Sequence, residues 1–391
     1  MNSKSQLEYT SPEPFADSIS KPRIFGSPGR YVQGDGVIDQ AGHYLSRLGF
    51  QRSLVLLSAR CLQAEGRRLI DSMQKAGLQF ELAQFGGECS LQEISMHLEA
   101  ASALDNPVSS VVAVGGGKVV DAGRALAQRL GVPVAVIPTL ASNDAPTAAV
   151  SVIYTPEGVT ADAEVYDLNP ALVLVDTGVV AAAGSRYLSA GMGDGLATWY
   201  EARACAATST GVNVFGARPT LAGTALAKLC ADTIFQQGID AMAAVRASKV
   251  NVALEDVVEA NTLLSGLGYE SGGLAVAHAI AQGYTVIEKV HRDHLHGEMV
   301  AMGIMTQLAL EQADEELDQA ARFFLAVGLP VHLGQLGLSA SDSNELQAIV
   351  DGAMAFPFIV NMTETVTSAS LLDAVLRADQ YGRRLQADSN G

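Results

Sequence analysis

A change of pattern near residue 176 constrains the fold of this chain more than any other feature. Before it, short β-rich runs alternate with segments of helical spacing. The β-rich runs cover residues 53–57, 80–85, 108–114, 132–137 and 172–175, and the helical segments cover residues 59–75, 91–104 and 118–130. This alternation predicts parallel βαβ units, in which helices cover both faces of a sheet.

After residue 176, β-branched clusters become rare and long Ala/Leu-rich segments follow one another. These segments cover residues 187–207, 219–237, 251–264, 274–287, 298–311, 316–327 and 371–385. In the last of them, apolar residues from Leu371 to Tyr381 recur at helical spacing, as in a helix bundle. Because 391 residues are too many for one ordinary core, we predict a flexible tail over residues 1–22, an α/β domain over 23–180 and an all-α domain over 181–391.

The amino-acid composition limits which binding partners and which cellular compartment we expect for this chain. The formal net charge of −17 argues against nucleic acid or an anionic membrane as partner, since either needs an electropositive face. No apolar run approaches the roughly 20 residues that span a bilayer, and the first 20 residues lack the apolar core of a signal peptide. The cysteines form no C-x-x-C pair, which is typical of thiols in a reducing compartment: Cys61, Cys89, Cys205 and Cys230. We therefore expect a cytoplasmic protein.

Three consecutive glycines mark the first candidate site, in V-A-V-G-G-G-K-V-V-D at residues 112–121. A β-rich run leads into the glycines, and a helical segment begins directly after them. Glycines let the backbone approach a pyrophosphate closely, and a helix N-terminus offers free N–H groups and a partial positive charge. The spacing matches neither G-x-G-x-x-G nor the P-loop, so a tight turn without a ligand explains the glycines alone equally well.

A polar loop follows the next β-rich run, in P-T-L-A-S-N-D-A-P at residues 138–146. The carboxyl ends of parallel strands share one edge of a sheet, and open α/β folds bind ligands at this edge. We therefore expect Thr139, Ser142, Asn143 and Asp144 near the glycine turn, on a loop that two prolines stiffen. Taken by itself, the loop is better explained as an Asx-type turn.

Candidate metal ligands lie in the helical half of the chain. Its motifs are G-M-G-D-G at residues 191–195, G-G-L-A-V-A-H at 272–278 and H-R-D-H-L-H-G-E at 291–298. Two imidazoles and one carboxylate suit a catalytic divalent ion with open coordination positions. Spacing alone does not select the ligands, because a histidine on an apolar helix is more often a core residue. We interpret His43, His97 and His332 as core or surface residues and leave His291 and His294 unassigned.

Taken in order, these motifs resemble the glycerol dehydrogenase branch of the iron-containing alcohol dehydrogenase family. The resemblance runs from about residue 25 to about residue 385. Besides the motifs above, it includes S-P-G-R-Y-V-Q-G, F-G-G-E-C-S, S-V-I-Y-T-P-E-G, G-D-G-L-A-T-W-Y-E-A-R-A-C, E-S-G-G-L-A-V-A-H-A-I and H-G-E-M-V-A-M-G. No single motif identifies this family, but the order in which all of them occur does.

The resemblance implies a Rossmann-like dinucleotide-binding α/β domain, an all-α domain and an active site in the cleft between them. It places one divalent metal on Asp194, His278 and His296, with zinc favoured and iron acceptable. These three residues and Asp144 become the catalytic and substrate-binding residues. The cofactor, NAD or NADP, falls on Ser58, Gly116, Gly117, Lys118, Val119, Val120, Asp121, Thr139, Leu140, Ser142, Ala148, Val150 and Tyr154. Relatives of this kind assemble as homo-oligomers, commonly dimers or octamers.

The implied reaction transfers a hydride between a small polyol and the cofactor, with glycerol to dihydroxyacetone as the best single choice. The metal would act as a Lewis acid on the alcohol oxygen, and Asp144 would hydrogen-bond a second hydroxyl. Other vicinal diols, 2-hydroxy acids and ketones remain alternatives. A sugar-phosphate lyase of the dehydroquinate synthase type would need clustered basic residues, in which the helical half is poor. The last alternative is an inactive relative that only binds metal and nucleotide.

Several departures from the family pattern bear on specificity. Ser58 stands where NAD-using members carry an Asp that bonds the ribose and repels a 2′-phosphate, so we expect a weakened NAD preference. Gln282 replaces a second histidine and cannot take up a proton at neutral pH. Asn143 and Ala148 stand where glycerol-using relatives often have Thr and Ser, and residues 159–168 match poorly. These changes leave the reaction class intact and put the substrate in doubt.

Overall fold

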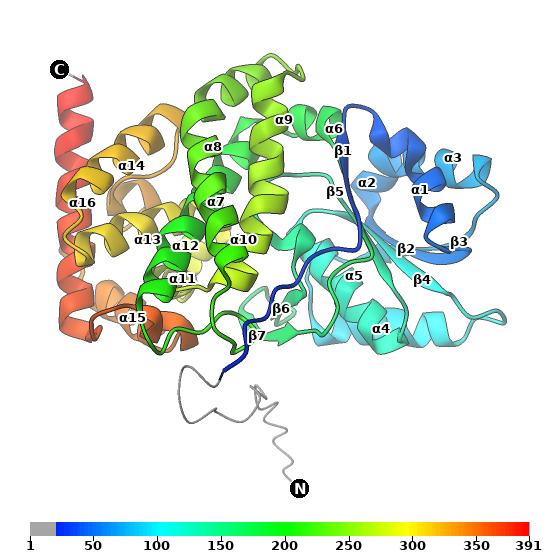
Figure 1. Ribbon diagram of the computed structural model, residues 1–391, viewed down its shortest axis with the longest axis horizontal. Helices are drawn as coiled ribbons and strands as arrows, with labels where there is room; N and C mark the ends of the chain where they lie inside the picture. Colours follow the sequence, from blue (N-terminus) through cyan, green and yellow to red (C-terminus); the bar gives the residue numbers. More distant parts are fainter. Residues whose placement is uncertain (1–20, 391) are drawn as a thin grey trace, which may run out of the picture.

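The computed structural model describes residues 21–390, which form a sheet with its helices and a helical part beside it (Figure 1). The sheet has six strands in the order β1-β8-β5-β4-β2-β3, and every neighbouring pair is parallel. These strands are β1 (Tyr31–Gly34), β2 (Arg52–Ser58), β3 (Gln79–Phe85), β4 (Ser110–Gly115), β5 (Val134–Pro138) and β8 (Leu172–Asp176). The predicted fold class, a parallel α/β sheet followed by helices, is confirmed.

Helices cover both faces of this sheet because its strands are apolar on both sides. Val55 and Leu57 of β2 belong to the core on one face, and Leu54 and Leu56 belong to the core on the other. The helices of this part are α1 (Ala41–Arg47), α2 (Ala59–Gln63), α3 (Glu65–Lys75), α4 (Leu91–Ser102) and α5 (Gly117–Leu130). The core that contains Leu54 continues without a break into the helical part, which holds the sheet and the helices against each other.

After β8, the described chain contains helices and connecting loops only. The helices are α6 (Thr177–Ala183), α7 (Ser185–Ala207), α8 (Leu221–Arg246), α9 (Val252–Glu259), α10 (Ser265–Gly272), α11 (Val276–Thr285), α12 (Glu288–Asp293), α13 (His296–Leu310), α14 (Asp314–Val327), α15 (Ser343–Met354) and α16 (Ser368–Asn390). Helix α13 is buried along most of its length, whereas α16 lies along the outer edge of the molecule (Figure 1). None of the described helices is long and apolar enough to cross a membrane.

Three strands were not predicted from the sequence. Strands β6 (Val150–Tyr154) and β7 (Thr160–Val165) form an antiparallel hairpin outside the main sheet, and β1 pairs with β8 at the edge of the sheet. Each of these strands has few buried residues, so none carries the continuous apolar run that identified β2, β4 and β8. Short segments of this kind give a weak periodic signal.

Three of the predicted helices differ in the structure. The helix expected over residues 219–237 continues to Arg246 as α8. The helix expected over residues 59–75 is broken at Ala64, where the backbone leaves the helical region with φ −120° and ψ −104°. The helix expected over 251–264 continues to Gly272 through a π-helical turn at Ala260–Leu264. A Cβ on Gly268 would lie 3.1 Å from the Ala227 Cα, so this glycine lets the extended helix pack closely against α8. The tail predicted over residues 1–22 falls almost entirely outside the described residues.

Candidate active site

The carboxyl ends of three neighbouring strands bring the predicted cofactor loops together. In the β4–β5 register Gly115 pairs with Pro138, and in the β2–β4 register Leu57 pairs with Val114. The chain therefore leaves the sheet at three neighbouring points of one edge, at Ser58, at the glycine turn and at Thr139. The expectation that the two motif loops share this edge is confirmed.

The glycine turn leaves the start of α5 open. Gly116 is the residue before the helix, and no side chain caps the helix there. A Cβ on Gly117 would lie 2.7 Å from Asn143 Nδ2, and one on Gly116 would lie 3.2 Å from Leu140 Cδ1. The glycines thus let the polar loop pack against the turn. Because the N–H groups of a first helical turn suit an anionic group, the residues here fit the pyrophosphate of a dinucleotide.

Lys118 joins the glycine turn to the β6–β7 hairpin. Its Nζ pairs with the Glu88 carboxylate at 2.7 Å and lies 5.0 Å from the centroid of the Tyr154 ring on β6. The remaining cofactor candidates lie along the same edge or behind it: Val119 and Val120 on α5, Ser142 in the polar loop, Ala148 after the short turn Ala145–Thr147, and Val150 at the start of β6. The side chains of Val120 and Ala148 are fully buried.

Asp121 and Arg124 connect α5 to the chain that follows Asp144. Arg124 Nη1 donates to Asp121 Oδ1 at 2.9 Å, and its Nη2 donates to the Ala145 carbonyl at 2.5 Å. The other Asp121 oxygen accepts the backbone N–H of Val152 at 3.3 Å. Burial raises the pKa of Asp121 to about 6, against the opposing effect of Arg124. Both Asp121 oxygens are therefore engaged with protein donors.

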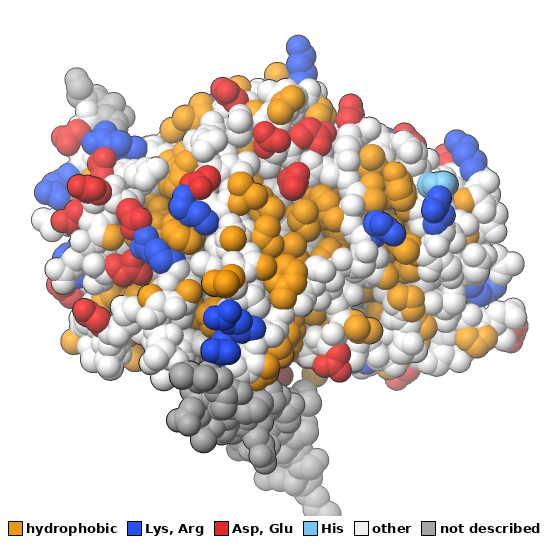
Figure 2. All heavy atoms as spheres, in the orientation of Figure 1, with side chains coloured by type: hydrophobic (Ala, Val, Ile, Leu, Met, Phe, Trp, Pro, Cys, Tyr) orange, Lys and Arg blue, Asp and Glu red, His pale blue; other side chains and the backbone are white. Residues whose placement is uncertain are grey.

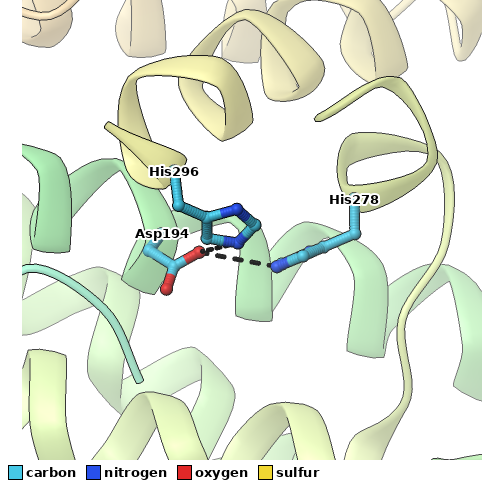
Figure 3. A group of neighbouring side chains, drawn as sticks. All are labelled: Asp194, His278 and His296. Atoms are coloured by element: carbon cyan, nitrogen blue, oxygen red, sulfur yellow. Dashed lines mark ion pairs between the residues drawn. The ribbon is translucent and has the colours of Figure 1, made fainter. Parts of the chain in front are cut away.

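Three helices bring Asp194, His278 and His296 together (Figure 3). One ligand atom of each residue lies within 4.8 Å of the other two. Asp194 Oδ1 is 3.4 Å from Nε2 of His278 and 3.4 Å from Nε2 of His296. Both imidazole rings turn toward the same carboxylate oxygen (Figure 3).

The glycines around these residues explain why the helices come so close. Asp194 lies in the middle of α7, and His296 is the first residue of α13. A Cβ on Gly193 would meet the Gly297 carbonyl oxygen, and one on Gly297 would meet the Ala190 carbonyl, both well inside van der Waals contact. The G-M-G-D-G and H-G motifs are therefore needed for α7 and α13 to pack, and this packing sets the distance between Asp194 and His296.

The buried Asp194 Oδ1, which faces two imidazole nitrogens, indicates that these residues fit a divalent cation. Oδ1 is buried and has no hydrogen-bond partner among the described residues, a costly state for a carboxylate that a cation would relieve. Burial opposes ionisation of Asp194, but the two imidazoles outweigh it and hold its pKa well below the ordinary value. The His296 side chain is 46% exposed, against 11% for His278 and 0% for Asp194. The site is therefore open to solvent beside His296.

Asp144 connects the polar loop to the metal candidates. Its backbone N–H donates to Asp194 Oδ2 at 3.1 Å, and its carboxylate accepts the Ser265 hydroxyl at 3.0 Å. Burial and the negative charge of Asp194 raise the pKa of Asp144 well above the ordinary value. All four candidate catalytic residues thus meet where the edge of the sheet faces α7.

Sequence reasoning missed the side chains that support this arrangement. Glu201 follows Asp194 by two helical turns on the same face of α7, and it contacts the His278 ring, with Oε2 2.5 Å from Nδ1. Asn261, in the π-helical turn, donates to the Ala141 carbonyl at 3.0 Å, and Ser265 bonds Asp144. The two-turn spacing to Asp194 was a usable signal for Glu201. Nothing local marked Asn261 or Ser265.

Gln282 and four of the five remaining histidines have polar partners away from the metal candidates, and the His43 ring packs on Tyr44. Gln282 Nε2 donates to the Gly352 carbonyl at 3.3 Å. The histidine contacts are His97 Nε2 with Glu93 at 2.9 Å, His291 Nε2 with the Gly158 carbonyl at 2.5 Å, His294 Nδ1 with Glu298 at 3.3 Å and His332 Nε2 with Gln386 at 2.8 Å. Each of these contacts is to a protein group.

Comparison with known proteins agrees with this geometry. Residues 28–177 match the family model described as iron-containing alcohol dehydrogenase. The chain is 44% identical over 364 residues to the glycerol dehydrogenase of Escherichia coli O6:H1, covering 93% of this chain and 98% of that protein. It is 40% identical to the glycolaldehyde reductase of Halobacterium salinarum, covering 93% and 99%. The crystal structure of glycerol dehydrogenase from Schizosaccharomyces pombe superposes with a TM-score of 0.90 at 34% identity, covering 96% and 95%.

The fold and the site define an alcohol oxidoreductase with a nicotinamide cofactor and a divalent metal. A dinucleotide-type glycine turn and a carboxylate–imidazole cluster meet at one edge of a parallel sheet, as the class requires. The relatives settle the family: the chain belongs to the iron-containing alcohol dehydrogenases.

Proposed function

We propose that this chain catalyses the reversible oxidation of glycerol to dihydroxyacetone, with transfer of a hydride to a nicotinamide dinucleotide and release of a proton. The observation that carries this proposal is the buried Asp194 Oδ1, which lacks a hydrogen-bond partner among the described residues and faces two imidazole nitrogens beside the cofactor edge of the sheet. The names of the E. coli and S. pombe relatives support glycerol as the substrate.

Each group of residues has a separate task in this proposal. Asp194, His278 and His296 would hold one metal ion, and the turn at Gly116 and Gly117 would hold the pyrophosphate. When bound, the metal supplies Lewis-acid polarisation of a substrate hydroxyl and the nicotinamide supplies the hydride acceptor. Asp144 would bind the neighbouring hydroxyl of a vicinal diol. The exposed side of His296 leaves room for the substrate to enter.

We favour zinc as the metal, because two imidazoles and one carboxylate with an open fourth position form a common catalytic zinc site. Iron(II) suits the same donors. For the cofactor we propose NAD, with NADP tolerated. The Ser58 hydroxyl accepts the Cys61 backbone N–H at 3.2 Å and caps α2. Because a serine carries no charge, this residue at the end of β2 would not repel a 2′-phosphate.

A second candidate substrate comes from a different relative. The H. salinarum protein, 40% identical to this chain, is named a glycolaldehyde reductase. A hydroxyaldehyde presents a carbonyl next to a hydroxyl, as dihydroxyacetone does, so the same residues could bind it. We propose the reduction of such hydroxyaldehydes as the alternative activity of this site.

We also propose a cytoplasmic homo-oligomer. All four cysteines are free and buried, which fits a reducing compartment. On the face shown in Figure 2, hydrophobic side chains form a band across the middle of the molecule, and Lys and Arg are interspersed with Asp and Glu. Exposed apolar residues include Leu221 on α8 and Val252 at the start of α9, and such surface is common at subunit interfaces. Light scattering coupled to size exclusion tests the oligomeric state.

A spectrophotometric screen tests the proposed function. The substrates are glycerol, other vicinal diols, 2-hydroxy acids, dihydroxyacetone and glycolaldehyde, each with both cofactors. We expect glycerol to give the highest kcat/KM among the alcohols, chelation to abolish the activity and zinc to restore it. Activity that survives complete metal removal would refute the metal-dependent mechanism. Preference for a 2-hydroxy acid over every diol would refute glycerol as the substrate.

A further inference from the structure

Glu201 makes an unusual set of contacts at the start of α11. Its side chain is fully buried on α7. Oε1 accepts the backbone N–H groups of Ala275 and His278 at 2.9 and 2.8 Å, and Oε2 lies 2.5 Å from Nδ1 of the His278 ring. One buried carboxylate thus binds the backbone and the ring of the same histidine.

These contacts determine which ring nitrogen carries the proton. Backbone N–H groups only donate, so Oε1 is committed to accepting and the orientation of the carboxylate is fixed. Oε2 then accepts from Nδ1, which must carry a hydrogen. In the neutral ring the lone pair is left on Nε2, and Nε2 is the atom that lies 3.4 Å from Asp194 Oδ1.

We propose that Glu201 is a positioning residue, which holds His278 in the Nδ1-protonated form and thereby keeps Nε2 available as a metal ligand. The inference rests on the metal site of the proposed function. Histidines that bind metals commonly donate their other ring N–H to a carboxylate, which orients the ring and increases its basicity as a ligand. Glu201 would do this from the helix that also carries Asp194, so a single rigid element sets two of the three ligands.

A purely structural role is the competing explanation, because Glu201 also caps α11. Helix α11 begins after Ala275, whose own side chain cannot cap it. A carboxylate at this end satisfies free N–H groups and interacts favourably with the helix dipole. Gln307 of α13 caps the same helix start: its Oε1 accepts the Ala277 N–H at 3.0 Å. In contrast to Glu201, Gln307 makes no hydrogen bond to the His278 ring, which makes it a matched control.

The variant Glu201→Gln separates the two roles. If its amide oxygen stays on the two backbone N–H groups, its NH₂ group donates to Nδ1 and moves the ring proton to Nε2, which blocks the metal ligand. If the amide turns the other way, its NH₂ group faces two N–H donors and the cap is lost. A glutamine has the shape of the glutamate, so a change in metal affinity reports the lost charge and the changed hydrogen bonds, and not packing.

The experiment measures zinc affinity by competition with a chelating dye and records the visible spectrum of the cobalt(II)-loaded protein, with a thermal melt for each variant. We expect Glu201→Gln to bind zinc on the order of 10–100-fold more weakly than the wild type and to have an altered cobalt spectrum. Gln307→Met should lower the melting temperature but keep zinc affinity within about twofold, since it removes the cap on Ala277 and the bonds to the Tyr200 carbonyl and Glu311 but none to the His278 ring. Glu201→Asp keeps the charge and should give an intermediate affinity; it replaces Glu201→Gln if that variant does not fold.

The outcomes separate this inference from the proposed function. If the wild type binds no zinc, or binds it equally well after Asp194→Asn, the proposed metal site is wrong. If the wild type binds zinc and both Glu201 variants bind it equally tightly, the metal site stands and the role of Glu201 is refuted. Equal losses of affinity in Glu201→Gln and Gln307→Met would likewise refute it, because they would trace the effect to the helix cap.

Discussion

The two sides of the proposed active site consist of different chemical groups. The cofactor side is mostly backbone: a glycine turn after β4 and the uncapped start of α5. The metal side is made of side chains, with Asp194, His278 and His296 coming from three separate helices. Buried hydrogen bonds hold two of these side chains, through the Asp144 N–H on Asp194 and Glu201 on His278.

This difference predicts how each side responds to substitution. Backbone donors are retained when a side chain changes, so the cofactor side should be sensitive mainly to added volume. The metal side depends on the identity of single atoms, so it should be sensitive to changes that keep the volume and alter one donor or acceptor. Three substitutions test this contrast and a fourth tests a buried contact beside it; they follow in order of expected effect.

The largest effect should come from Asp194→Asn, which keeps the shape and removes the charge. We expect kcat/KM for glycerol to fall by at least about 10³-fold, because a lost metal removes several kcal/mol of stabilisation, and zinc affinity to fall with it. Steady-state kinetics and dye competition measure both quantities. Asp379→Asn is the control, since Asp379 is also buried and also accepts a backbone N–H, from Leu333 at 2.8 Å. Normal turnover in Asp194→Asn would contradict the assignment.

Glu270 tests the contact between α10 and the chain on either side of the β6–β7 hairpin. On α10, its carboxylate accepts the Ala149 N–H at 2.5 Å and the Asn169 amide at 2.7 Å, and burial raises its pKa from 4.5 to about 7. The folded state therefore binds this proton more tightly than the unfolded state. Its contribution to stability is complete below about pH 4.5 and is lost as the pH rises through about 7.

Relative to Glu270→Gln, the wild type should lose on the order of 3 kcal/mol of folding free energy across this range. Urea unfolding of both proteins at several pH values measures the difference. The stability advantage of the wild type should shrink between pH 5 and pH 8. A difference that stays constant with pH would show that Glu270 does not titrate in this window.

Gly117→Ala probes the backbone side, because the new Cβ would lie 2.7 Å from Asn143 Nδ2 and push the polar loop away from the turn. We expect NADH to bind roughly tenfold more weakly, about 1.4 kcal/mol, with zinc affinity unchanged. Fluorescence titration measures the cofactor Kd. Gly131→Ala is the control at the other end of α5: Gly131 has φ +66°, so the variant should lose stability without changing the Kd. Unchanged NADH binding in Gly117→Ala would argue against the turn as the cofactor site.

An effect no larger than that of Gly117→Ala should come from Ser58→Asp, which places a carboxylate at the end of β2. We expect the ratio of kcat/KM for NAD over NADP to rise about tenfold, since the charge repels the 2′-phosphate. Ser58→Asn is the matched control, because Asn and Asp both cap a helix as Ser58 caps α2, but only Asp carries a charge. A strong NAD preference in the wild type would contradict the expected tolerance of NADP.

Much of the cofactor side could be predicted from the sequence. The strand–glycine–helix order at residues 112–121 and the loop after β5 were both located, and the pairing of Gly115 with Pro138 places them together as expected. The break at Ala64 and the π-helical turn at Ala260–Leu264 were not predicted. The helical spacing of the apolar residues marks neither the break nor the π-helical turn.

The metal side was identified from motifs in a known order, not from spacing. A long stretch of chain separates Asp194 from His278, and no local preference indicates that they meet. Asp194 and His296 meet because Gly193 and Gly297 let α7 and α13 pack closely, and His278 joins them from α11.

The sequence by itself determined the order of the elements, the glycine turn and the residue types available for chemistry, because turns and periodicity depend on neighbours within a few positions. Only the tertiary structure decided that Asp194 Oδ1 receives no hydrogen bond from the described residues and faces two imidazole nitrogens, and that Glu201 bonds the ring of His278. Such contacts join side chains on different helices. They exist only once the packing of those helices has fixed the distances between them.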